Sequence, residues 1–182
     1  NKDNRLSIGS GDYAEILRHA VAVIEHARTE IARHVNGYVS TAYWEIGQML
    51  HERKIESGYG DSMVRRLSAD LKERYPKMGV SPRQLWNMKK FYERYVGHDE
   101  KVLHSVALLP WSHNLLLLSK RLDDNATLYY ATKTVEKGWN RDLLLNAIKL
   151  KMYETQALAR VDNNFDRTLP AEQAQYANEV FS

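Results

Sequence analysis

Basic and amide side chains at helical spacing between residues 61 and 96 are the part of this sequence that points most directly to chemistry. This segment holds nine Lys and Arg against four Asp and Glu, whereas the whole chain has 26 against 23, so the positive charge is concentrated there. Lys and Arg bind phosphate, and Asn or Gln can pair with adenine in the major groove of DNA. On a helix over 82–96, at ~100° per residue, four such side chains line up at 4-3-4 spacing: Arg83, Asn87, Lys90 and Arg94.

The opposite side of the same helix is apolar, which is typical of a helix that packs one face on a protein core. A further helix is predicted over 62–75, and Pro76 through Val80 reads as a turn. Helix, turn and basic helix in this order indicate a divergent helix-turn-helix or winged-helix-like unit. The turn is longer than the roughly three to four residues of a compact helix-turn-helix. The predicted apolar side consists of Leu85, Met88, Tyr92, Tyr95 and Val96.

We therefore expect duplex DNA to be contacted by basic and amide side chains of both helices and of the turn. An alternative interpretation is a solvated helix face, because exposed faces carry charge for solubility in most proteins. The candidate DNA-binding residues are Arg65, Arg66, Lys72, Lys77, Arg83, Gln84, Asn87, Lys90 and Arg94.

An apolar seam near the N-terminus is the second feature that could support a function. Apolar residues recur at 3-4-3-4 spacing from residue 17 to 31 and resume from 35 to 50. Either one helix runs from 12 to 57, ending at Gly58-Tyr59-Gly60, or two helices meet near Gly37. The seam could form a coiled coil in a homodimer, or it could pack inside its own domain. The candidate dimer-seam residues are Leu17, Ile24, Ile31, Val39 and Ile46.

No catalytic or metal site is predicted in this chain. His19, His26 and His34 are too far apart along a helix to share a metal ion, at ~1.5 Å per residue. His113 lies beside a predicted helix start, where a structural hydrogen bond is the expected role. The sequence has no cysteine, which excludes disulfides, thiolate metal sites and cysteine nucleophiles. No phosphate-binding loop or nucleophile elbow is present either.

The overall composition predicts a helical protein that functions away from membranes. The chain has 182 residues, enough for one substantial core. Only nine Gly and four Pro are present, and no stretch alternates like a strand, so we expect an all-α fold with few turns. No apolar run reaches the ~20 residues of a membrane span, and we expect a cytoplasmic location. Predicted helix starts lie at Ser81, Ser112, Asp123 or Asp124, and Asn140.

Three regions are expected along the chain. Residues 1–11 form a flexible lead-in, 12–160 form the helical domain, and 161–182 form a polar linker that leads into a further domain.

Five short motifs carry a resemblance to a known family. They are Tyr43-Trp44-x-Ile46-Gly47, Gly58-Tyr59-Gly60, Ser81-x-Arg83-x-Leu85-Trp86-x-Met88-x-x-Phe91-Tyr92, Leu109-Pro110-Trp111-Ser112-His113 and Gly138-Trp139. Over about residues 12 to 170 the chain resembles the N-terminal domain of the bacterial YhcG-type family.

This resemblance implies a protein in two parts, a helical DNA-binding domain followed by a nuclease domain of the PD-(D/E)xK superfamily. The run from Asn164 to Pro170 resembles the junction between them. The resemblance places the catalytic carboxylates and their Mg²⁺ in the nuclease domain, and it implies no catalytic residue, cofactor or metal in this chain.

Two functions remain open from the sequence. The first is a DNA-binding module that targets an attached nuclease domain to duplex DNA. The alternative is an oligomerisation or partner-docking module that uses the seam and does not contact DNA. A homodimer is compatible with both, because paired DNA readers are often dimers.

Overall fold

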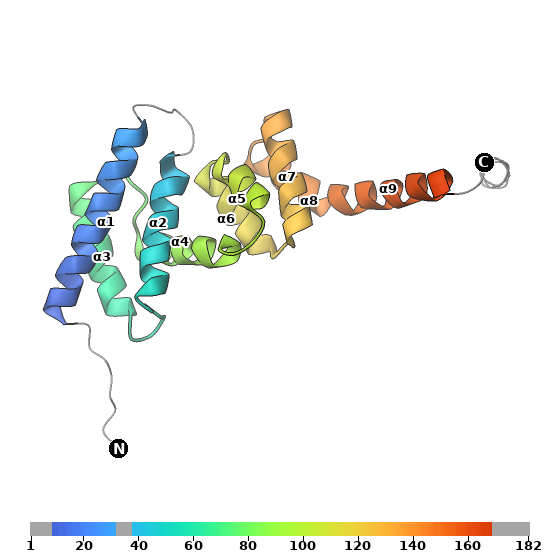
Figure 1. The fold of residues 1–182 in the computed structure, drawn as a ribbon. Helices are drawn as coiled ribbons and strands as arrows, with labels where there is room; N and C mark the ends of the chain where they lie inside the picture. Colours follow the sequence, from blue (N-terminus) through green and yellow to red (C-terminus); the bar gives the residue numbers. More distant parts are fainter. Residues whose placement is uncertain (1–8, 32–37, 169–182) are drawn as a thin grey trace, which may run out of the picture.

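The computed structural model describes residues 9–31 and 38–168, and within them it contains helices and no strand (Figure 1). The predicted all-α class is therefore confirmed. None of the helices in this described part is long and apolar enough to cross a membrane. In chain order the helices are α1 (Ser10–Ile31), α2 (Tyr38–Glu52), α3 (Asp61–Arg74), α4 (Pro82–Tyr95), α5 (Glu100–Ala107), α6 (Trp111–Lys120), α7 (Asp124–Lys137), α8 (Arg141–Lys149) and α9 (Met152–Thr168).

The N-terminal seam is shared by two helices, α1 and α2, which lie side by side and antiparallel (Figure 1). Ile24 and Ile46 are each 0% exposed in the core of the single chain, and Leu17 packs against the same core. Ile24 and Ile46 thus face inward within one chain, whereas Leu17 is only partly buried. The side chains of the other two seam candidates, Ile31 and Val39, lie outside the described residues.

The end of α2 differs from the expected glycine stop. The helix ends at Glu52, well before Gly58, and Lys54 adopts a left-handed conformation with φ of 54°. The backbone N–H of Ile55 then bonds to the carbonyl of Leu50 at 3.0 Å, which closes the end of the helix locally. Residues 53–60 therefore form a connection made of turns, and this connection contributes to the candidate site.

Three of the predicted helix starts are confirmed by side-chain caps. The side-chain oxygens of Ser81, Asp123 and Asn140 each accept a hydrogen bond from the backbone N–H three residues on, at 2.8 to 3.3 Å. The prediction for Ser112 is wrong. Pro110, two residues before Ser112, occupies the cap position without a side-chain hydrogen bond, and helix α6 begins at Trp111. Local sequence thus determines these helix starts wherever a capping side chain is available.

Helix α4 connects two hydrophobic cores. Its first half places Leu85 and Met88 in a core built with α1, α2 and α3. Its second half places Phe91 and Tyr95 in a core built with α5 to α8. The chain is therefore organised around α4, which runs between the two groups of helices in Figure 1.

A close approach of α2 to α4 depends on Gly47. A Cβ atom at this position would lie 2.1 Å from the carbonyl oxygen of Met88 and 3.1 Å from the Cβ of Tyr92. Only a residue without a side chain allows the two backbones to come this close. Gly47 thus fixes how deeply α4 is set against α2.

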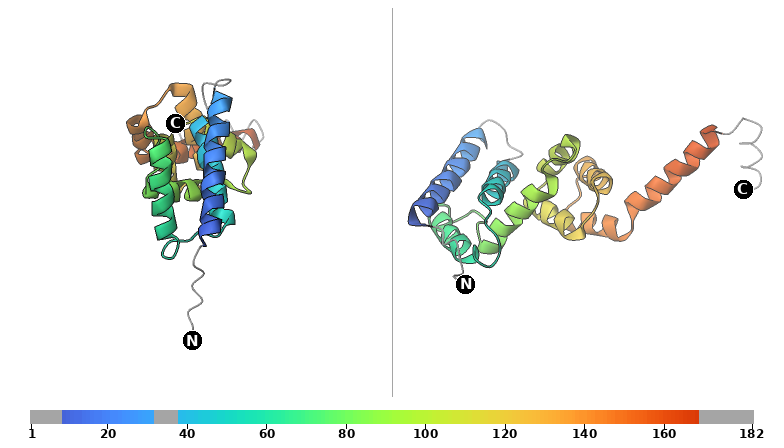
Figure 2. Two further views of the ribbon diagram at one scale, coloured as in Figure 1. Left: turned by 90° about the vertical axis from the view of Figure 1, so that its left-hand side faces the viewer. Right: turned by 60° about the horizontal axis from the view of Figure 1, so that its bottom comes forward.

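The last helix, α9, extends away from the other helices (Figures 1 and 2). It continues to Thr168, although we expected the helical domain to give way to a linker near residue 160. Asn163 and its polar neighbours cost a helix only a few tenths of a kcal/mol each, and no Gly or Pro lies between Gly138 and Pro170. Residues 1–8 of the predicted lead-in over 1–11 and the final segment 169–182 lie outside the described residues, whereas residues 10 and 11 already belong to α1.

Candidate nucleic-acid interface

Helix α4 has the two faces that its sequence predicts, with one correction. Leu85, Met88, Tyr92 and Tyr95 are buried. Val96 follows the helix rather than belonging to it, and it is 40% exposed. The helix begins with Ser81 as its cap and Pro82 in its first turn, which suits the fixed φ of proline.

The polar face of α4 lines a groove of about 680 Å³. Arg83, Asn87 and Lys90 all contribute to it, so the structure brings together three of the four side chains that the helical spacing predicted. The opposite wall comes from the connection after α2. The complete lining is Glu56, Ser57, Arg83, Trp86, Asn87, Lys89, Lys90 and Glu93.

A buried lysine links the two sides of this groove. The Lys89 side chain is 8% exposed, and its ammonium group lies 3.0 Å from Glu56 and 3.3 Å from Glu93. Burial alone would lower the pKa of Lys89, but the hydrogen bonds to these two carboxylates outweigh burial and raise it. Lys89 is therefore charged, and it neutralises part of the acidic charge in the groove.

Glu93 is also held by His51, whose ring nitrogen lies 3.1 Å from the carboxylate. Burial would raise the pKa of Glu93, yet the hydrogen bonds with His51 and Lys89 together lower it. The groove thus has charged walls whose positions are set by mutual ion pairs. Such prearranged polar groups lose little freedom when a ligand binds.

Arg83 and Lys90 differ from Lys89 because both are exposed and neither has an ion-pair partner among the described residues. Asn87, between them on the helix, is half-buried and has no hydrogen bond within the same residues. These three side chains therefore remain available to a ligand, two as cations and one as an amide donor and acceptor.

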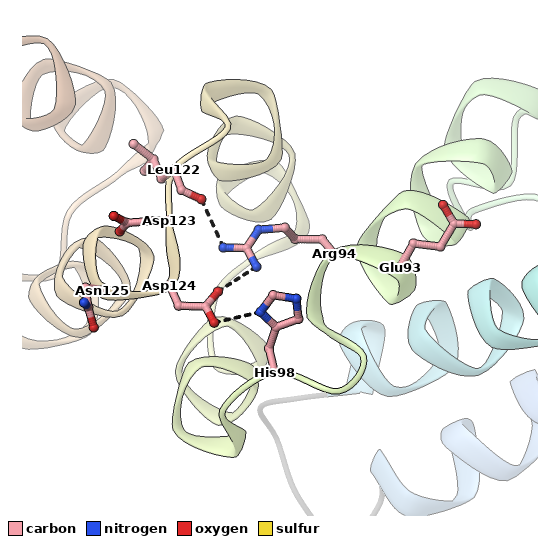
Figure 3. A pocket seen from close by; sticks show the side chains of 7 residues that line it. All are labelled: Glu93, Arg94, His98, Leu122, Asp123, Asp124 and Asn125. Carbon is pink, nitrogen blue, oxygen red and sulfur yellow. Dashed lines mark hydrogen bonds and ion pairs between the residues drawn. The ribbon is translucent and has the colours of Figure 1, made fainter.

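Arg94, the fourth predicted side chain of the polar face, is occupied by contacts inside the protein (Figure 3). Its guanidinium donates to the carboxylate of Asp124 at 2.7 Å and to the carbonyl of Leu122 at 3.0 Å. His98 approaches the other oxygen of Asp124 at 2.7 Å. Arg94 thus anchors α4 to the start of α7, so we do not include it among the ligand-facing residues.

Gln84 is likewise used within the fold. Its side-chain oxygen accepts a hydrogen bond from the indole N–H of Trp111 at 2.7 Å. Because Trp111 packs against both cores, Gln84 joins α4 to the centre of the molecule. Gln84 is therefore a weaker candidate than Asn87 for an amide that contacts a DNA base, because its side chain is already hydrogen-bonded within the protein.

The predicted residues of α3 and of the following connection are exposed, but the structure does not bring them into the groove. Arg65, Lys72 and Lys77 are all on the surface, and Arg65 contacts Ser62 of its own helix at 3.5 Å. Arg66 lies over the ring of Tyr13, with 3.8 Å from its guanidinium carbon to the ring centroid. Arg66 therefore also connects α3 to α1.

Five groove residues were not among the candidates from sequence: Glu56, Ser57, Trp86, Lys89 and Glu93. Glu56 and Ser57 come from a connection that carries no pattern pointing to a site. Lys89 was counted in the basic segment, but a Lys at this position gave no indication that it is buried. Trp86 was visible as part of a family motif and as a neighbour of Asn87, and an aromatic residue inside a basic segment is a usable signal for nucleic-acid binding.

The histidine next to the α6 start is structural, as expected. The Nε2 atom of His113 donates to the carbonyl of Trp139 at 2.8 Å, and the side chain is buried. Among the described residues, no group of three or more His, Asp or Glu is placed to hold a metal ion.

The chain is similar to known proteins over most of its length. The chain is 28% identical to "Putative nuclease YhcG" of Escherichia coli (strain K12), in an alignment that covers 81% of this chain and 47% of that protein. The chain thus spans about half the length of this curated relative. No solved structure matches this chain. The DUF1016 N-terminal domain model matches residues 19–155, and the chain therefore belongs to the DUF1016 N-terminal domain family.

Proposed function

We propose that this chain is a DNA-binding module that directs an attached nuclease domain to duplex DNA, with the polar face of α4 as the contact surface. The observation that carries the proposal is the placement of Arg83, Asn87 and Lys90 in one groove, with both cations unpaired within the described residues. Unpaired cations on a helix face are suited to binding DNA phosphates, because no ion pair within the protein has to break before the phosphate contact forms.

Two further observations support the proposal. Positive charge is concentrated in residues 61–96, although the whole chain carries a net charge of only +3. The relative in Escherichia coli is named as a nuclease, and this chain corresponds to about half of its length. A nuclease acts on nucleic acid, so a module in the same chain that binds DNA would raise the local concentration of substrate.

The test is fluorescence anisotropy of the chain with a labelled duplex over a series of salt concentrations. The variant is the double change Arg83→Ala and Lys90→Ala. Each phosphate contact that is lost should reduce the slope of log affinity against log salt by about 0.9. We therefore expect the slope to fall by roughly 1.8 units in the double variant.

A matched control removes the same charge elsewhere. Lys137 and Lys149 are exposed, lie at the ends of α7 and α8, and have no ion pair within the described residues. Changing both to Ala should leave the slope close to that of the unchanged chain. Equal slopes for the two double variants, or no binding at low salt, would refute the proposal.

The alternative function, a module that oligomerises through the N-terminal seam, has less support. Ile24 and Ile46 are fully buried within one chain, so a second copy could reach them only if the first core opened. Sedimentation equilibrium of the chain tests this alternative directly. A stable dimer that dissociates when Leu17 is changed to Glu would restore it.

A further inference from the structure

The shape of the α4 groove points to a particular kind of DNA. A helix that reads the major groove must project beyond its neighbours, because a groove about 12 Å wide takes in the helix itself. Helix α4 instead packs against α2, α3 and α6, and Glu56 and Ser57 face its polar side across the groove. This polar side is therefore concave, and it can receive a group that protrudes from the DNA.

The volume of the groove matches a small ligand or part of one. At about 680 Å³, it falls within the range of roughly 300–1,000 Å³ that is usual for ligand pockets. A nucleoside with its phosphate is a ligand of that class. An intact duplex is far too wide to enter a groove of this volume, so the part of a DNA molecule that could occupy it is an unpaired nucleotide.

Trp86 provides a surface on which a base can stack. Its side chain packs against the first core while it also lines the groove, so it is partly buried and held in place. Stacking of a base on an aromatic side chain contributes about 1–3 kcal/mol per base and requires no particular sequence. In an uninterrupted duplex the base faces are covered by their neighbours, which leaves Trp86 without a partner.

The polar groups around Trp86 are complementary to the rest of a nucleotide. Arg83 precedes Trp86 by one helical turn and Lys90 follows it by one turn, so cations lie on both sides of the indole. Asn87 can donate to and accept from a base edge. The carboxylate of Glu56 is 61% exposed despite its ion pair with Lys89, and a carboxylate accepts hydrogen bonds from the amino groups of bases.

We propose that the α4 groove receives an unpaired nucleotide, stacked on Trp86, so that this module prefers DNA containing unpaired nucleotides to uninterrupted duplex. The inference rests on the proposed function and deepens it by naming the class of DNA. Phosphates next to the unpaired nucleotide would contact Arg83 and Lys90. Duplex DNA offers the same phosphates, so these two contacts should contribute to the binding of both kinds of DNA.

The test compares the affinity of the 182-residue chain for three labelled DNAs: a duplex, the same duplex with one unpaired nucleotide, and a single strand. One stacked base should make the two DNAs with unpaired nucleotides bind about tenfold more tightly than the duplex. The fluorescent base 2-aminopurine at the unpaired position should lose emission on binding, because it stacks on an indole. Uniform affinity for all three DNAs would overturn the inference.

Two substitutions separate stacking from packing. Trp86→Leu keeps an apolar side chain against the core but removes the aromatic face, so the preference should fall to about twofold or less and 2-aminopurine emission should be retained. Trp86→Phe keeps an aromatic face and should retain most of the preference. Thermal unfolding of both variants confirms that they are folded.

The outcomes distinguish this inference from the proposed function. Duplex binding that depends on Arg83 and Lys90, without any preference for unpaired nucleotides, refutes only the groove assignment. A preference that persists in Trp86→Leu also refutes it. An absence of salt-dependent binding to all three DNAs refutes both proposals.

Discussion

Substitution of Gly47 by Ala tests the packing on which the candidate site depends. The added Cβ would lie 2.1 Å from the carbonyl oxygen of Met88 and 2.7 Å from its carbonyl carbon, both of which are backbone atoms of α4. Ordinary van der Waals contact begins at 3.4 Å. Because neither backbone can rotate away as a side chain could, α2 and α4 must move apart by roughly 1 Å.

The magnitude follows from two opposing effects. Overpacking of this kind costs about 1–3 kcal/mol and occasionally more, and a gap of about 1 Å forfeits up to half of the dispersion attraction across the contact. Ala is favoured over Gly within a helix by about 1 kcal/mol, which offsets part of this cost. We expect a net loss of about 2 kcal/mol, equivalent to a decrease of roughly 4–8 °C in Tm for a domain of this size.

The assay is urea denaturation followed by far-ultraviolet circular dichroism, with thermal unfolding as a second measurement. Gly11→Ala is the matched control. This residue lies in the first turn of α1, is exposed, and has nothing within 4 Å of an added Cβ. The control should be neutral or stabilised by up to about 1 kcal/mol. Equal or increased stability of Gly47→Ala would show that α2 and α4 are not in close contact at this position.

Three other changes test the contacts around the two cores and the groove. Asn140→Ala removes the cap of α8 and should cost about 1 kcal/mol of unfolding free energy by urea denaturation, whereas Asn140→Ser should restore most of it. The pKa of Asp124 is lowered, and the hydrogen bond with His98 is the largest cause. Burial of the carboxylate acts in the opposite direction, and the contact with Arg94 lowers the pKa further. The stabilising contribution of Asp124 is therefore complete above the ordinary pKa of 3.8 and is lost as the pH falls through the lower folded-state pKa. Asp124→Asn should accordingly lower the urea midpoint near neutral pH and flatten its acid dependence, and an unchanged acid profile would contradict the assigned ion pair. Lys89→Met leaves Glu56 and Glu93 without their shared cation, so DNA affinity should fall at least as much as in Lys90→Ala, although Lys89 itself is buried. Anisotropy at fixed salt measures this difference, and unchanged affinity would argue that phosphate does not approach these carboxylates.

Local sequence determined the helical architecture to a large extent. The spacing of apolar residues predicted α3 and α4 to within one residue at each end, and the caps at Ser81, Asp123 and Asn140 form as expected. These features depend on contacts between residues three or four positions apart, which the sequence displays directly. The two faces of α4 are predictable for the same reason, since side chains three or four positions apart on a helix lie on the same face.

Contacts between distant residues were decided only by the tertiary structure. The sequence showed a basic line ending in Arg94, but Asp124, thirty positions further on, takes that side chain into the fold. It showed one apolar seam, whose halves lie on antiparallel helices and bury each other. It gave no sign that Glu56 would face α4 across a groove, or that Lys89 would bridge the two sides. Such pairings depend on how helices cross and on where a glycine such as Gly47 lets backbones approach. Periodicity along one chain segment carries no information about either.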